Sequence, residues 1–332
     1  MGTGRRILAA VVTSALFLGA FVLLLTAFAG VDGAERSDRG AADDQRVSSA
    51  AAGGPAVLYS VLVGSGNSGN SEIFVADASG MMQLTDYGGA DHSPSWSPDG
   101  TQVAFASDRD DPGNLDIYVM NADGSGVRRI TTDEEVDAHP AWSPDGTQLA
   151  YQRSDGKGHW ELFIIGVDGS GERQITRNNV SDESPTWSPD GTQLAFERFV
   201  GTDLEIFVMD VDGTSERRVT NLPGQDHAPV WSPDGKAIAF SRDADEDGTS
   251  DVWTVDVGGG EATQVTNGVN ATVPVGWAAD GLTLFFQSET RGAVDVVAVR
   301  PSSGALDVVA LPPQARTALA PGYVLGVDVQ DG

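Results

Sequence analysis

The stretch HPAWSPDGTQLAYQRSDG, from His139 to Gly156, contains a WSPDG motif that recurs with small changes along the chain. Tryptophans that precede a short turn ending in Asp-Gly follow one another at spacings of 46, 45, 44 and 46 residues; they are Trp96, Trp142, Trp187, Trp231 and Trp277. A fixed period of this length is the mark of a repeat architecture, and it decides the fold class before any other feature does.

Each period contains four short runs rich in β-branched and aromatic residues, separated by clusters of Gly, Asp and Ser. In the unit of Trp142, the first run leads up to the tryptophan, and the others cover residues 148–153, 161–166 and 173–176. Four antiparallel strands in about 45 residues are the signature of one blade of a β-propeller. The period therefore predicts an all-β propeller.

The SPDG part of the motif has the chemistry of a tight turn. In residues 143–146, Pro sets φ for the first central position, Asp suits the second, and Gly accepts the conformation that follows. We therefore expect a hairpin between the first and second strands of each blade, with the tryptophan filling the wedge between neighbouring blades. Repetition itself favours this structural role, because several copies of one catalytic motif would be redundant.

The two ends of the repeat region predict six blades. Before Trp96, residues 57–61, 72–76 and 82–85 supply three strands of a blade that lacks its first strand. Near the carboxyl end, the segment APGYVLGVDV lies one period after Trp277 and supplies the missing strand. The first blade is then closed by the C-terminal strand, which removes open sheet edges that would otherwise aggregate.

Residues 93–131, SPSWSPDGTQVAFASDRDDPGNLDIYVMNADGSGVRRIT, resemble the repeat of TolB-type propellers, and the resemblance extends over nearly all of residues 56–328. It implies the propeller fold and a protein or peptide partner. The repeat is shared with the propeller caps of prolyl-oligopeptidase-like peptidases and with oligogalacturonate lyases, so fold and function need separate arguments. We expect no α/β domain like the one that precedes the TolB propeller, because the 55 residues before the first strand read as leader and linker. We expect no hydrolase domain either, because there is no G-x-S-x-G motif and no residues are left over to form such a domain.

The amino terminus predicts export. Arg5 and Arg6 precede an uncharged, mostly apolar run over residues 7–29, which is long enough to cross a bilayer as an N-terminal hydrophobic helix and also ends in a small-x-small cleavage pattern. Residues 1–30 are thus a signal anchor or a cleaved signal peptide, and residues 31–55 have the composition of a flexible linker. The propeller of residues 56–328 would then be extracytoplasmic, either anchored to the membrane or secreted.

Charge and cysteine content narrow the range of partners. The chain of 332 residues has a net charge of −28, which repels nucleic acid and anionic lipid headgroups. It has no cysteine, so disulfides, thiolate metal sites and thiol nucleophiles are excluded. The resemblance implies that the partner is a protein or peptide of the cell envelope, and we expect the propeller to be a monomer.

Candidate ligand-binding residues cluster just before the tryptophans, where an innermost propeller strand begins at the channel mouth. An Asp stands five residues before four of the tryptophans, with a His or a Glu beside it; the set is Asp91, His92, Asp137, His139, Asp182, Glu183, Asp226 and His227. One interpretation is a ring that holds a divalent cation or a cationic group of a partner. The other is that these Asp residues cap turns that enter the inner strand.

A candidate calcium loop lies in the segment DADEDGTSD, where Asp243, Asp245, Asp247 and Asp251 alternate around Gly248. This spacing suits a hard cation, although Thr254 stands where an EF-hand has its bidentate Glu. An ordinary acidic surface loop is the alternative. Calcium or another divalent cation is the one cofactor that the sequence suggests.

Acidic residues also open the third strand of every blade, at Glu72, Asp116, Glu161, Glu205, Asp251 and Asp295. We expect Arg153, Arg198 and Arg242, each eleven residues after a tryptophan, to be their partners. Taken together, the sequence favours a protein-binding or peptide-binding module over an enzyme. The alternative is a carbohydrate-active enzyme similar to oligogalacturonate lyases, with a His/Asp metal site at the channel mouth.

Overall fold

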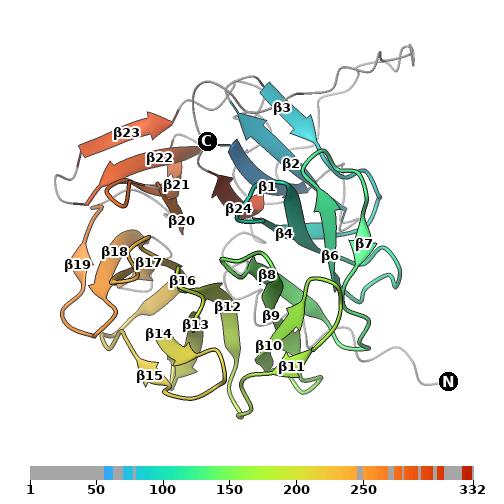
Figure 1. Ribbon diagram of the computed structural model, residues 1–332. Coiled ribbons are helices and arrows are strands. Elements are labelled where there is room, and N and C mark those ends of the chain that lie inside the picture. Colours follow the sequence, from blue (N-terminus) through green and yellow to red (C-terminus); the bar gives the residue numbers. More distant parts are fainter. Residues whose placement is uncertain are drawn as a thin grey trace, which may run out of the picture.

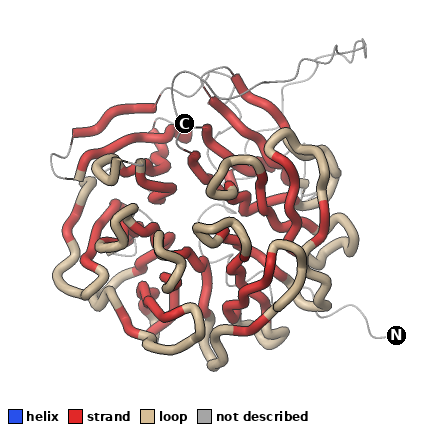
Figure 2. Tube along the Cα trace, in the orientation of Figure 1, coloured by secondary structure: helices blue, strands red, loops and turns tan. Residues whose placement is uncertain are grey.

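The computed structural model describes residues 56–62, 70–77, 80–244, 250–267, 273–278, 280–290, 293–301, 305–309 and 324–330. These residues form strands and connecting loops, with no helix among them (Figure 2). The predicted leader and linker, residues 1–55, lie outside this part of the chain. A search of the described residues finds no helix that is both long and apolar enough to cross a membrane.

Within the described residues, four separate antiparallel sheets of four strands radiate from a common centre (Figure 1). The first sheet contains β24 (Val324–Gln330), β1 (Ala56–Leu62), β2 (Ser71–Asp77) and β3 (Gly80–Gln83), and the second contains β4 (Asp91–Trp96), β5 (Gln102–Ser107), β6 (Asp116–Asn121) and β7 (Arg128–Arg129). The third sheet contains β8 (Asp137–Trp142), β9 (Gln148–Ser154), β10 (Trp160–Gly166) and β11 (Arg173–Gln174). The fourth sheet contains β20 (Val273–Trp277), β21 (Leu284–Thr290), β22 (Ala293–Arg300) and β23 (Ala305–Val309).

The remaining described strands form one eight-stranded sheet, so the structure has four separate four-stranded sheets and not the six that the period predicts. The sheet contains β12 (Asp182–Trp187), β13 (Gln193–Val200), β14 (Asp203–Asp210), β15 (Arg217–Arg218), β16 (Gln225–Trp231), β17 (Ala237–Asp243), β18 (Asp251–Asp256) and β19 (Thr263–Gln264). The reason for the difference is a single parallel pair, Leu204 with Gln225, which connects β14 to β16.

The strands nearest the centre contact one another in a closed circle, in the order β4, β8, β12, β16, β20 and β24 (Figure 1). Closure depends on β24, which pairs antiparallel with β1 from Ala56–Gln330 to Val61–Val324 and also contacts β4 and β20. The predicted C-terminal closing strand is therefore present. Because β24 comes from the far end of the chain, it joins the first sheet to the last.

The SPDG segments form the predicted hairpins. The Gly146 N–H donates to the Ser143 carbonyl at 2.8 Å, Gly146 has φ of +69°, and an Asp145 carboxylate oxygen accepts from the Ser143 hydroxyl at 2.6 Å. The indole N–H of Trp142 donates to the Ser95 carbonyl of the preceding sheet at 3.1 Å, and Trp187 repeats this contact with the Ala141 carbonyl. The tryptophans thus lie between neighbouring sheets and fix their spacing, as predicted.

Four of the six innermost strands, β4, β8, β12 and β16, are interrupted near their beginning by a bulge where a non-glycine residue has positive φ. These residues are Ser93, His139, Ser184 and Ala228, with φ between +49° and +53°. The pairing register shifts at the same place, for example between Glu183 and Thr186 on β12. We call the face where the innermost strands begin the entry face. The bulges lie there, and the SPDG hairpins lie on the opposite face.

Candidate functional site at the entry face

The four aspartates of the predicted ring are buried and each is held by an arginine. Asp91, Asp137, Asp182 and Asp226 have 0% exposure. Arg153 binds Asp137 through Nε and Nη2 at 2.6 and 2.9 Å, and Arg198 binds Asp182 in the same bidentate way at 2.5 and 2.8 Å. Arg109 and Arg242 hold the remaining two aspartates at distances from 3.0 to 3.2 Å. Their carboxylates are therefore engaged within the sheets.

These arginines also pack on aromatic rings. The Arg153 guanidinium lies 4.7 Å from the ring centre of Phe163, and that of Arg198 lies 4.9 Å from Phe207. Burial raises the pKa of Asp137 to about 6, although hydrogen bonding and charge attraction from Arg153 oppose the rise. A charged pair this deep in the protein needs both partners, because either one alone would be an uncompensated buried charge.

The expected pairing of Arg153, Arg198 and Arg242 with the acids of the third strands is wrong. The antiparallel register places each of these arginines directly opposite the aspartate of the innermost strand, as in the pairs Asp137–Arg153 and Asp182–Arg198. The third strand lies on the other side, where the register also brings Glu161 and Glu205 opposite Arg153 and Arg198, but no ion pair forms between them.

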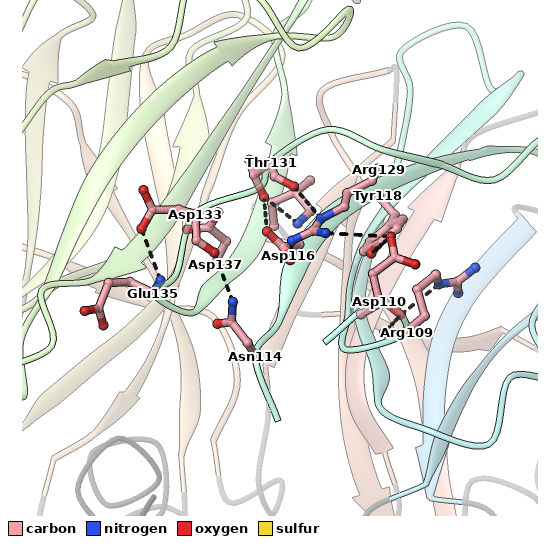
Figure 3. Close-up of polar contacts among 12 residues, drawn as sticks. Arg109, Asp110, Asn114, Asp116, Tyr118, Arg129, Thr131, Asp133, Glu135 and Asp137 are labelled. Atoms are coloured by element: carbon pink, nitrogen blue, oxygen red, sulfur yellow. Dashed lines mark hydrogen bonds and ion pairs between the residues drawn. The ribbon is translucent and has the colours of Figure 1, made fainter. Parts of the chain in front are cut away.

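The described acids of the third strands have a different and repeated role. Asp116 accepts a hydrogen bond from the Thr131 hydroxyl at 3.2 Å and from Arg129 Nη2 at 2.5 Å (Figure 3). Glu205 is held in the same way by Thr220 and Arg218. Asp251 binds the Thr266 hydroxyl at 2.9 Å and Gln264 at 3.0 Å. These contacts tie the third strand of a blade to the residues around its outermost strand, so the acids are structural.

The other predicted residues of the ring gather nearer the centre. His92, Glu183 and His227 are half-buried and His139 is exposed, all on innermost strands at the entry face. The pKa of His92 is lowered to about 4, mainly by burial and also by the nearby His139. The charges of Asp91 and Asp108 oppose this lowering. Solvent reaches His139, but the surrounding strands exclude much of its water, and this desolvation lowers its pKa against the opposing charge of Glu197. Both imidazoles are therefore neutral at neutral pH.

Glu197 on β13 joins this group and was not predicted. It is 7% exposed, its Oε1 accepts a hydrogen bond from the Ala228 N–H at 2.7 Å, and its Oε2 lies 3.7 Å from His227 Nδ1. A signal was present, since Glu197 is the one acid in the strand segment QLAFERFV, where it stands beside Arg198. We name His92, His139, Glu183, Glu197 and His227 the central cluster.

The two glutamates of the central cluster differ in ionisation. The pKa of Glu183 is raised to about 7, mainly by burial and also by the charge of Glu197. The Ser181 hydroxyl and His227 act in the opposite direction. For Glu197, burial also raises the pKa, but hydrogen bonding and charge from His227, with the Ala228 N–H and His139, outweigh it and leave the pKa below its ordinary range. The pair therefore carries one to two negative charges at neutral pH.

No group of three His, Cys, Asp or Glu side chains is placed to hold a metal ion within the part of the chain that the structure describes. In the candidate calcium loop, Asp243 is buried at the end of β17, and Asp251 serves the third-strand role given above. Asp245 and Asp247 lie outside the described residues. The calcium site stays a prediction.

The closed circle of radiating antiparallel sheets defines the protein as a β-propeller. The family model of the TolB beta propeller domain matches residues 59–163 and 152–318, which together make up more than half of the chain. The chain therefore belongs to the TolB β-propeller domain family. A search of curated proteins finds no match.

Solved structures share the fold at low sequence identity. TolB from Acinetobacter baumannii superimposes with a TM-score of 0.69 at 18% identity, over 83% of this chain and 66% of that one. The putative TolB from Agrobacterium tumefaciens gives a TM-score of 0.61 at 18% identity, over 84% and 98%. Oligogalacturonate lyase from Vibrio parahaemolyticus gives 0.53 at 16%, over 79% and 75%. The chain thus spans just under two thirds of the Acinetobacter TolB, and these likenesses establish the fold alone.

Proposed function

We propose that this protein is an exported propeller that binds a protein or peptide of the cell envelope at its entry face. Residues 1–30 would direct export as a signal anchor or signal peptide, and residues 31–55 would tether the propeller of residues 56–328 outside the cytoplasmic membrane. Membership of the TolB family supports an extracytoplasmic binding module. The observation that carries the proposal is the central cluster, a group of polar side chains gathered at the middle of the ring.

We also propose that the ring has six blades, with the eight-stranded sheet counted as two. Six innermost strands support this count, since each contacts the next around the centre. The parallel connection between β14 and β16 involves one residue pair, whereas β16 and β17 are joined by five pairs. Two blades that touch at one point account for these contacts better than one continuous sheet.

The enzyme alternative has less support. An oligogalacturonate-lyase-like activity would be favoured by a metal centre built from His92, His139 and His227. The described residues contain no such three-ligand group, and the likeness to the lyase from Vibrio parahaemolyticus concerns the fold. A net charge of −28 is also a poor match for an anionic polyuronate.

The binding proposal predicts that partner capture depends on the entry face. The full chain carrying an affinity tag, a His92→Ser, His139→Asn double variant and a Lys236→Gln control are each incubated with envelope extract. Asn tolerates the positive φ at position 139, and Lys236 is an exposed residue that follows β16 on the opposite face. We expect the wild type and the control to recover the same proteins, and the double variant to recover at least about fivefold less.

Equal recovery by all three proteins, measured at equal melting temperatures, contradicts the proposal. The proposal is also contradicted if the wild type recovers no envelope protein above the level found with empty resin.

A further inference from the structure

Glu183 and Glu197 form a like-charge pair directly across neighbouring strands. The register of β12 and β13 makes them Cα partners. The same position holds His92 with Ala106, Ala138 with Gln152 and His227 with Ser241 in the neighbouring blades. Like charges placed opposite each other destabilise a sheet, and one residue earlier the same two strands hold the attractive pair Asp182–Arg198. The carboxylate pair is thus a local cost to folding.

The charge of Glu197 is not needed for its hydrogen bond. Glu197 Oε1 accepts the Ala228 N–H of the next innermost strand at 2.7 Å, and in the preceding blade Gln152 Oε1 accepts the Ser184 N–H at 2.8 Å. Gln152 and Glu197 occupy equivalent positions, each just before the arginine that holds an aspartate. A neutral amide therefore supplies the same backbone contact. The negative charge at position 197 acts instead on its neighbours, since His227 attracts it and Glu183 opposes it.

Glu183 lacks the cation that the neighbouring carboxylates have. Its Oε1 is buried and has no hydrogen-bond partner within the described part of the chain. The nearby Arg198 is already engaged by Asp182 and Glu216. Buried carboxylate oxygens are almost always paired, so an oxygen without a donor marks a place where one is missing.

The central cluster is partly open to solvent. Glu183 and His227 are partly accessible and His139 is exposed, so a ligand can approach the cluster from the entry face. His92 and His139 are neutral and do not repel a cation. Two adjacent carboxylates match a guanidinium, which donates several hydrogen bonds in one plane. The absence of a third metal-type ligand among the described residues favours an organic cation over a metal ion.

We propose that Glu183 and Glu197 bind one cationic side chain, an arginine or lysine of the partner, at the centre of the entry face. This rests on the proposed binding function and names the chemistry of the partner group. The ligand supplies the positive charge that Glu183 lacks, so the Glu183 carboxylate costs stability in the free protein and contributes affinity in the complex. Carboxylates with this trade-off are typical of binding sites.

The test uses a small probe and the full chain. N-acetyl-arginine amide is titrated into the wild type, Glu197→Gln and Glu183→Gln up to about 20 mM, with N-acetyl-citrulline amide as the neutral control of the same shape. We expect arginine amide to bind the wild type saturably and to bind both variants at least about tenfold more weakly. Citrulline amide should bind the wild type at least about tenfold more weakly than arginine amide does. Because burial and the charge of Glu197 raise the pKa of Glu183 to about 7, Glu183→Gln removes a destabilising charge and should melt about 2–4 °C higher than the wild type at about pH 8.

Acidification gives a second readout. Glu183 is faced by Asp182 on its own strand, Glu197 on β13 and His227 on β16, and it takes up a proton as the pH falls below about 7. Arginine amide should therefore bind about tenfold more weakly at about pH 5.5 than at about pH 8. His92, with a pKa of about 4, stays neutral over this range.

Three results would overturn the cation site: no binding of arginine amide to the wild type, equal binding to Glu197→Gln, or equal binding of citrulline amide. A melting temperature of Glu183→Gln below that of the wild type would show that the Glu183 charge is structural. Arginine amide binding without partner capture would leave the cation site standing and remove the envelope-binding function, so the two failures are distinct.

Discussion

Deleting residues 313–332 should abolish cooperative folding. The deletion removes β24, which pairs with β1 over its whole length and contacts β4 and β20. It opens the edge of β1, whose Leu58 and Tyr59 are fully buried, and it breaks the circle of innermost strands. The loss is comparable to the whole stability of a domain, about 5–15 kcal/mol, and the exposed edge invites aggregation.

Thermal unfolding followed by circular dichroism, together with size-exclusion chromatography, measures this effect. Deletion of residues 331–332 alone is the control, because it leaves β24 intact. A form that ends at residue 312 and melts in the same transition as the full chain would rule out closure by the C-terminal strand.

Replacing Arg153 by Met should destabilise the protein by about 3–5 kcal/mol at neutral pH. The change leaves the fully buried Asp137 without its bidentate partner, while the Met side chain still packs on Tyr151 and Phe163. The double variant Arg153→Met, Asp137→Asn should recover part of the loss, since no charge is then left buried. Arg177→Met, the same substitution at an exposed arginine, should change stability by less than about 0.5 kcal/mol.

The loss should shrink as the pH falls. Asp137 has a folded pKa of about 6, above its ordinary value, so the folded state holds its proton more tightly than the unfolded state between about pH 4 and 6. Removing Arg153 raises the pKa of Asp137 in the folded state further. Protonation of Asp137 at lower pH then removes the buried charge. Urea unfolding at about pH 7 and about pH 4.5 should therefore show the larger difference from wild type at pH 7. A difference that is equal at both pH values would contradict a charge-based role.

The strands could be predicted closely because backbone conformation follows local sequence. Runs at 148–153 and 161–166 correspond to β9 and β10 within about one residue, and adding one period to Trp277 located β24. The connection of β14 with β16 could not be predicted, since one residue pair in a parallel arrangement leaves no trace in the repeat. It depends on how two neighbouring blades approach.

The side-chain partners were harder to predict than the strands. Three repeats have an Asp and an Arg at equivalent positions, as with Asp137 and Arg153, but only the register across the bulge shows that they face each other. In the second blade the equivalent position is Ser107, and Arg109 from the following loop reaches Asp91 instead. The sequence thus located the ring of acids, yet it could not separate the aspartates that hold the blades together from Glu183, whose carboxylate lacks a cation. Glu197 entered only through the cross-strand register.

The most direct test of this account is the ionisation of Glu183, measured by carbon NMR of the glutamate carboxyl groups across a pH titration. Glu183 should titrate near pH 7 in the wild type and at lower pH in Glu197→Gln, because the repelling charge is gone. Addition of arginine amide should lower the midpoint in the wild type as well. A Glu183 carboxyl that titrates near its ordinary value in the wild type, and does not respond to Glu197→Gln, would contradict the unpaired carboxylate site.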